Sequence, residues 1–88
     1  MPIDDPLTHK IIGCAMNVHS ILGNGFQELI YQRALEIEMR EAQIDFAREQ
    51  EIPIYYKGRE IGTRRVDFLV ENQVMVELKA ILRFEDIH

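Results

Sequence analysis

Two short runs in the second half of the chain, residues 66–70 and 74–78, carry an apolar side chain at every second position. This period is that of a β-strand with one buried face, because successive strand side chains point to opposite sides. Glu71-Asn72-Gln73 between the runs is typical of a turn, so we predict antiparallel strands over about 60–70 and 74–80. A shift of register by one residue would mix the two faces, so the pattern determines the parity of the pairing. The face predicted to be buried holds Val66, Phe68, Val70, Val74, Val76 and Leu78.

The opposite face of this strand pair carries charged residues that the same pairing brings together. Asp67 is expected directly across from Glu77, and Arg65 across from Lys79. Two facing carboxylates repel each other, and a divalent cation such as Mg²⁺ or Mn²⁺ would relieve the repulsion. Lys79 would then lie beside the metal, where it could orient a water or stabilise charge on a phosphate. The alternative is a solvated strand face on which Arg65 and Lys79 neutralise the acids by ordinary cross-strand pairing.

The segments before this strand pair predict two helices and one further strand. Asp5 as the N-cap and Pro6 as the first helical residue predict a helix over 6–22, which the glycines of Gly23-Asn24-Gly25 end. Good helix formers predict a second helix over 26–42. Residues 46–54 are expected to be extended, with a bend or an edge at Pro53, before a turn at 57–58. The fold class is therefore α+β, with two N-terminal helices packed on a small, mainly antiparallel sheet.

Glu28, in the first turn of the second predicted helix, has two interpretations. Helical spacing places it on one stripe with Tyr31, Leu35 and Met39, which should pack on the sheet. A carboxylate on a buried stripe would need a function, such as metal binding. A carboxylate in the first turn also suits the helix dipole, which requires no ligand. The sequence alone favours neither interpretation.

Charge and composition limit the classes of protein to which this chain can belong. The 88 residues suffice for one small domain, and the formal net charge of −5 argues against gripping nucleic acid by bulk electrostatics. The acidity lies in residues 1–56, with 4 basic and 9 acidic side chains, whereas residues 57–88 have 6 of each. Candidates for contacts with phosphates therefore come from the second half: Lys57, Arg59, Arg64 and Arg65.

The remaining features point to a protein of a reducing compartment with few other sites. No apolar run approaches the ~18 residues of a membrane span, no signal peptide is evident, and a single cysteine excludes internal disulfides, so we expect a cytoplasmic protein without membrane contact. Cys14 lies on the apolar stripe of the first helix and is expected to be packed. Tyr55 and Tyr56 could stack on bases, but packing is the ordinary role of strand aromatics beside a turn. The three histidines have no zinc-ligand spacing.

Several segments together resemble a known family. The run 22–31, with Gly25, Glu28 and Tyr31 at its signature positions, resembles the GxxExxY proteins, small prokaryotic proteins of the PD-(D/E)XK nuclease superfamily. The segments 54–58, 65–70 and 76–80 resemble that family in order and spacing, so the resemblance covers nearly the whole chain. Gly25 and Tyr31 are then structural members of the motif.

The resemblance implies a role for each of the candidate residues. Asp67 and Glu77 would be metal-binding acids, Lys79 the catalytic lysine, and Glu28 an additional acid of the metal site that is carried on a helix. The backbone carbonyl of Leu78 would supply a further metal ligand.

The resemblance also implies a fold and an activity. Family members continue past the position of His88 into a helix with a Gln-containing motif and at least one more strand. We therefore expect residues 1–88 to form a single nuclease-like domain, a restriction-endonuclease-like core truncated at its C-terminus. The expected function is divalent-metal-dependent hydrolysis of phosphodiester bonds in nucleic acid, with Mg²⁺ or Mn²⁺. The alternative is a catalytically inactive module of the same fold that assembles with other proteins or with itself, through an exposed sheet edge or apolar face.

Overall fold

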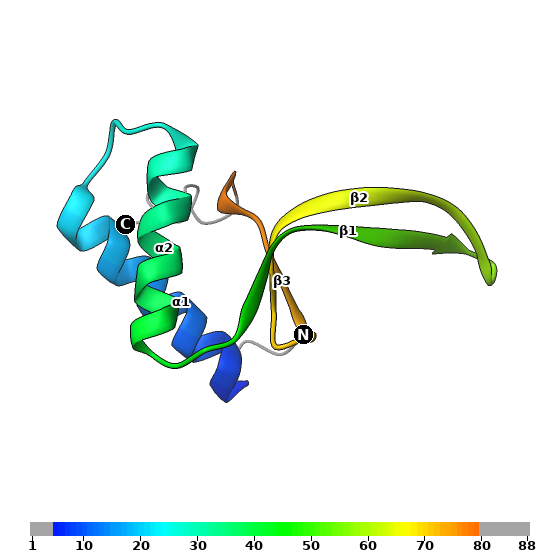
Figure 1. Ribbon diagram of the computed structural model, residues 1–88, viewed down its shortest axis with the longest axis horizontal. Coiled ribbons are helices and arrows are strands. Elements are labelled where there is room, and N and C mark those ends of the chain that lie inside the picture. The colour runs from blue at the N-terminus through cyan, green and yellow to red at the C-terminus, as the bar shows by residue number, and fades with distance from the viewer. Residues whose placement is uncertain (1–4, 80–88) are drawn as a thin grey trace.

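The computed structural model describes residues 5–79 of the chain, as two helices followed by a three-stranded antiparallel sheet (Figure 1). The predicted α+β class is confirmed. The elements, in chain order, are α1 (Pro6–Leu22), α2 (Glu28–Glu41), β1 (Phe46–Tyr56), β2 (Arg59–Val70) and β3 (Val74–Val76).

Helix α1 has the predicted bounds because both of its ends are determined locally. The Asp5 carboxylate accepts a hydrogen bond from the Thr8 backbone N–H at 3.1 Å, and Pro6 occupies the first turn, where no intrahelical donor is needed. Gly23 ends the helix with a φ of 67°, which residues with a Cβ rarely adopt. Ile11, Cys14, Ala15 and Val18 form its buried stripe.

Tyr31 holds the loop between the two helices. Its hydroxyl donates a hydrogen bond to the Gly23 carbonyl at 2.6 Å and accepts one from the Phe26 backbone N–H at 3.3 Å. Helix α2 therefore begins at Glu28, two residues later than predicted, because residues 26 and 27 belong to this loop. Tyr31, Leu35 and Met39 are buried along the stripe that the sequence predicted.

The sheet has the order β1-β2-β3, and its register confirms the predicted parity. Phe68 pairs with Val76 and Val70 with Val74, so the alternating apolar residues of β2 and β3 share one face, whereas Leu78 lies beyond β3. The prediction that the last strand extends to residue 80 is wrong beyond Val76. The N–H of Leu78 donates to the Asp67 side chain instead of to a strand carbonyl, and Leu78 and Lys79 begin a helical turn. Ala80 lies outside the described residues.

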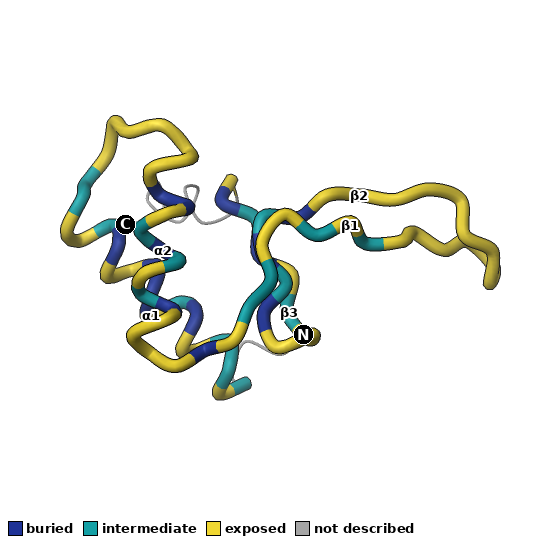
Figure 2. Tube along the Cα trace, in the orientation of Figure 1, coloured by how far each residue is buried: buried dark blue, intermediate teal, exposed yellow. Residues whose placement is uncertain are grey.

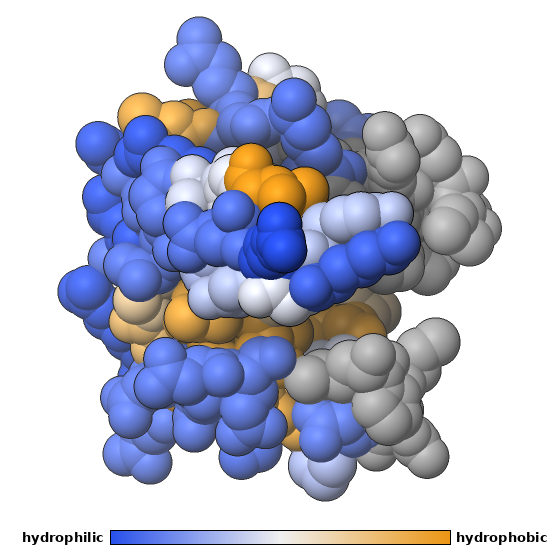
Figure 3. Space-filling model, turned by 90° about the vertical axis from the view of Figure 1, so that its right-hand side faces the viewer, coloured by the Kyte–Doolittle hydropathy of each residue, from blue (hydrophilic) through white to orange (hydrophobic). Residues whose placement is uncertain are grey.

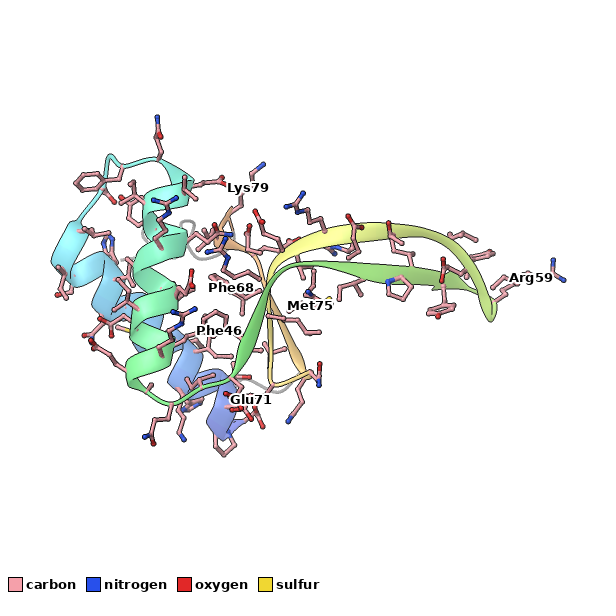
Figure 4. The ribbon with its side chains drawn as sticks, viewed as in Figure 1. Phe46, Arg59, Phe68, Glu71, Met75 and Lys79 are labelled. Carbon is pink, nitrogen blue, oxygen red and sulfur yellow. The ribbon has the colours of Figure 1, made fainter. Side chains whose placement is uncertain are left out.

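The two helices lie on the same face of the sheet and form the core with it. Figure 4 shows Phe46 and Phe68 on the helix side, where their rings meet edge to face at 5.3 Å, and Met75 on the other side. Among residues 5–79, nothing covers that other face, where the Met75 side chain is 52% exposed. The core cluster comprises Ile11, Cys14, Ala15, Val18, Tyr31, Leu35, Met39, Ile44, Phe68, Val70, Val76 and Leu78.

Strands β1 and β2 continue well past the helices as a two-stranded projection, which we call the arm and define as residues 53–65. Figure 2 shows the arm as an exposed hairpin, and every residue from 53 to 65 is exposed. The turn at its tip has a positive φ at both central residues, 50° at Lys57 and 81° at Gly58, as in two-residue hairpin loops. The arm accounts for the elongated shape, whose longest extent is 43 Å. Within the described part of the chain, neither helix is long and apolar enough to cross a membrane.

Candidate active site

Asp67 lies on the open face of the sheet, one residue before the pair Phe68–Val76. It is half-buried, and its Oδ2 accepts a hydrogen bond from the Leu78 backbone N–H at 2.7 Å. This bond ties β2 to the segment that follows β3 and fixes the direction of the carboxylate. Within residues 5–79 the second oxygen of Asp67 has no hydrogen-bond or ion-pair partner, so it is available to a ligand.

Glu77 follows β3 directly, one residue after Val76, which pairs with Phe68. The strand pairing ends there, so the predicted opposition of Asp67 and Glu77 stays a prediction. Its Oε1 contacts the Arg64 guanidinium, which comes from the base of the arm. The charge of Glu77 is therefore balanced by an arginine of the same chain. The sequence interpretation assigned this neutralising role to Arg65 and Lys79, and the structure gives it to Arg64.

A third acid that the sequence analysis missed, Glu49, lies on the other side of Asp67. Arg48 pairs with Phe68 and Gln50 with Val66, which leaves Glu49 across from Asp67. Glu49 has a left-handed backbone with a φ of 50°, a strained conformation for a residue with a Cβ. Its Oε2 forms an ion pair with the Arg65 guanidinium at 3.0 Å. The pattern of β1 alone gives no signal for this placement, because it depends on the register between β1 and β2.

Lys79 lies in the helical turn after Glu77 and not on a strand. Its side chain is exposed and points away from the sheet (Figure 4). The predicted pairing of Arg65 with Lys79 is wrong, because β3 ends before Lys79 and Arg65 binds Glu49. Lys79 has no carboxylate partner in the described part of the chain, so its ammonium is free to meet a phosphate or a water.

Glu28 is exposed in the first turn of α2, so the expectation that it lies on the buried stripe is wrong. The stripe begins with Tyr31, and the position of Glu28 suits the helix dipole. Among residues 5–79, no three His, Cys, Asp or Glu side chains are grouped closely enough to hold a metal ion. Glu28, Asp67 and Glu77 are therefore not gathered into one three-acid site, and their roles as metal ligands remain predictions.

Asp67 and the segment after β3 nevertheless offer oxygen ligands of the type that a hard divalent cation binds. Asp67 can supply carboxylate oxygens from β2, and Glu77 and the carbonyl of Leu78 lie in the segment that the Leu78 N–H ties to Asp67. Mg²⁺ commonly keeps several waters and takes only one or two protein carboxylates. Two carboxylates are therefore enough to bind such a cation, provided that Arg64 releases Glu77.

The structure also shows the surroundings of Cys14, Tyr55 and Tyr56. Cys14 is buried, as expected, and burial raises the pKa of its thiol, with a further increase from the Glu38 carboxylate. Tyr55 and Tyr56 are 62% and 61% exposed, so the expectation that they pack is wrong. A depression at the junction of α2 and β1 is lined by five residues, none of them a candidate site residue: Arg40, Gln43, Ile44, Asp45 and Phe46.

Comparison with known proteins identifies the family. A model of the PD-(D/E)XK nuclease superfamily matches residues 5–88. The chain belongs to this superfamily. No curated protein and no solved structure matches it. PD-(D/E)XK nucleases generally use divalent metals. The acid-x-Lys part of the superfamily's name corresponds to Glu77-Leu78-Lys79, and its preceding Asp to Asp67, although Val66 stands where the name has proline.

Proposed function

We propose that this PD-(D/E)XK protein hydrolyses phosphodiester bonds in nucleic acid with the help of Mg²⁺ or Mn²⁺. The observation that carries the proposal is the hydrogen bond from Leu78 to Asp67, which holds one acid of the motif beside the segment that bears the other motif residues. Superfamily membership supports the same chemistry.

Each residue of the motif has a distinct role in this proposal. Asp67 and Glu77 would hold the metal, together with the Leu78 carbonyl, and Glu77 would exchange its contact with Arg64 for the metal. A bound divalent cation would supply an activated water and stabilise charge on the phosphate. The exposed ammonium of Lys79 would orient the attacking water or pair with a phosphate oxygen. Glu28, exposed on α2, has no role in this proposal.

Cleavage and metal binding, measured separately, test the proposal. Single- and double-stranded DNA and RNA would be incubated with the protein in Mn²⁺, in Mg²⁺ and in EDTA, and Mn²⁺ binding would be followed by calorimetry. We expect cleavage in the metals, none in EDTA, and loss of both cleavage and metal binding in Asp67→Asn. Asparagine keeps an oxygen to accept the Leu78 N–H, so this variant should remain folded.

Two further variants serve as matched controls for this experiment. Asp45→Asn changes an exposed carboxylate outside the site and should leave cleavage unchanged. Lys79→Gln should lower cleavage and keep metal binding, whereas Lys10→Gln should alter neither. The proposal is wrong if Asp67→Asn cleaves like the wild type, or if EDTA has no effect on cleavage.

One observation favours the second candidate, a catalytically inactive module that acts in assembly. Arg64 contacts Glu77 and Arg65 pairs with Glu49, so both of these acids have cationic partners within the chain itself. The open sheet face and the exposed arm offer surfaces for a partner. Sedimentation would reveal self-association, and a monomer that cleaves in Mn²⁺ but not in EDTA would exclude this candidate.

A further inference from the structure

The arm differs in charge from the rest of the molecule. Residues 53–65 hold four basic side chains and one acidic one, a net charge of +3. The remaining residues hold six basic and fourteen acidic side chains, a net charge of −8. A basic projection on an acidic body presents its positive charge to a polyanion while the body repels it. The arm is therefore the part of the molecule that a nucleic acid would approach.

The tip of the arm combines this charge with exposed aromatic rings. Tyr55 and Tyr56 are 62% and 61% exposed, so their rings are accessible to a ligand. Tyr56 pairs with Arg59 across the hairpin, and the Lys57 ammonium lies 5.6 Å from the centre of the Tyr56 ring. Lys57 and Arg59 have no carboxylate partner within residues 5–79. Figure 4 shows Arg59 pointing outward from the tip.

The arm leads directly to Asp67. Strand β2 runs without interruption from Arg59 at the tip to Asp67 at the candidate site, a distance of about 26 Å at ~3.3 Å per residue. Arg64 and Arg65 lie between the two ends. Figure 3 views the molecule from the side on which the arm projects and shows hydrophobic surface on the arm and in a band below it, among hydrophilic residues. A strand bound along the arm would therefore end at the candidate site.

We propose that the arm binds single-stranded nucleic acid, with Tyr55 and Tyr56 stacking on unpaired bases and Lys57 and Arg59 contacting phosphates. The identity of the ligand rests on the proposed function. Stacking on a side chain requires a base that is free of its own stack, so a single strand fits and a continuous duplex does not. A second copy of the chain fits less well, because lysine and glutamate are depleted in protein interfaces and the tip carries Lys57 and Glu60.

Binding in EDTA tests this proposal without any cleavage. Fluorescence anisotropy would compare a labelled oligothymidine with a duplex of the same length. We expect the single strand to bind more tightly, and the double substitution Tyr55→Ser with Tyr56→Ser to weaken its binding at least about fivefold. Tyr55→Phe with Tyr56→Phe should restore the affinity, because the rings are kept. The control Ile21→Ser changes a side chain on α1 that is 74% exposed and should have no effect.

Substitution of the two basic residues Lys57 and Arg59 gives a second, independent measurement. Lys57→Gln with Arg59→Gln should weaken binding and reduce the slope of log K against log salt by about 0.7 for each phosphate that the variant no longer neutralises. Lys10→Gln, on α1, should leave the slope unchanged. All substituted positions are exposed, so thermal melting should confirm that the variants are folded.

Three outcomes would overturn the proposal: unchanged affinity in the tyrosine variant, a duplex bound as tightly as the single strand, or a dimer that dissociates when the tyrosines are replaced. The last outcome would assign the arm to self-assembly. A failure of the proposal that the arm binds a single strand can be distinguished from a failure of the catalytic proposal. Asp67→Asn should bind the single strand like the wild type, and arm-dependent binding without cleavage would leave the arm assignment standing while the catalytic proposal fails.

Discussion

At the scale of single residues, the candidate site holds three acids, and arginines balance two of them. Asp67 is fixed by the Leu78 N–H, Glu77 contacts Arg64, and Glu49 pairs with Arg65. These pairs are substantially exposed, so each contributes little to stability. They would instead affect metal binding, because a cation that binds Glu77 must compete with Arg64.

Removing this competitor should therefore strengthen metal binding. For Arg64→Gln we expect Mn²⁺ to bind about 1.4- to fivefold more tightly, because an exposed ion pair is worth about 0.2–1 kcal/mol. Calorimetric titration at fixed ionic strength measures the affinity, with the exposed Arg33→Gln as the control. Weaker or unchanged Mn²⁺ binding would show that Arg64 does not compete for Glu77.

Cys14 should titrate late because burial, and then Glu38, raise the pKa of its thiol above the ordinary value of 9.0. A raised pKa in the folded state stabilises the fold below the unfolded pKa, and that contribution is lost as the pH rises through the folded pKa. At pH 8 we expect a thiol reagent to react much more slowly with the native protein than with the denatured protein. Equal rates would contradict this expectation.

At the scale of the elements, some helix and strand ends are fixed by local contacts and others by contacts between elements. Helix α1 is capped by residues adjacent to it in sequence, whereas the start of α2 depends on Tyr31 reaching back to Gly23. Glu36 accepts hydrogen bonds from Arg40 at 2.8 Å and Arg48 at 2.9 Å, and the second of these ties α2 to β1. Strand β3 ends where Asp67 takes the Leu78 N–H.

The hydroxyl of Tyr31 should be measurable as a contribution to stability. Tyr31→Phe removes the hydrogen bonds to Gly23 and Phe26 while the ring stays buried, so the free energy of unfolding should fall by about 1 kcal/mol. Urea denaturation measures the loss. Tyr55→Phe, which removes a hydroxyl from an exposed ring, should cost nothing, and an equal loss in both variants would refute the role given to Tyr31.

At the scale of the whole molecule, stability and the proposed binding lie in different parts. The helices and the base of the sheet enclose the entire core cluster, and the arm carries only exposed residues (Figure 2). The arm therefore has little hydrophobic burial of its own and relies on the body to hold its two strands together.

Core and arm substitutions should separate these two parts. Phe68 is fully buried, so Phe68→Ala should lower the free energy of unfolding by about 3–5 kcal/mol, a large share of the stability of a small domain. Tyr56→Ala on the arm should change it by less than about 0.5 kcal/mol. Chemical denaturation followed by circular dichroism compares them, and a comparable loss in both would place part of the core in the arm.

The features that depend on near neighbours could be predicted from the amino-acid sequence. The bounds of α1 follow from Asp5, Pro6 and Gly23, and the parity of β2 and β3 follows from the alternation of apolar residues. Each of these needs only helical spacing, strand period or turn chemistry, which act over a few residues.

The surroundings of Asp67 depend on the pairing of segments that are far apart in the chain. A bulge between Ile54 and Tyr55 shifts the register of β1 by one residue, because Ile54 pairs with Gly62 and Tyr55 with Glu60. Without this shift, the two-residue turn would place Arg48 across from Asp67; with it, Glu49 takes that position. The end of β3 at Val76 likewise depends on a distant partner, because Asp67 accepts the Leu78 N–H. Register and burial join residues far apart in the chain, and periodicity within one segment carries no information about them.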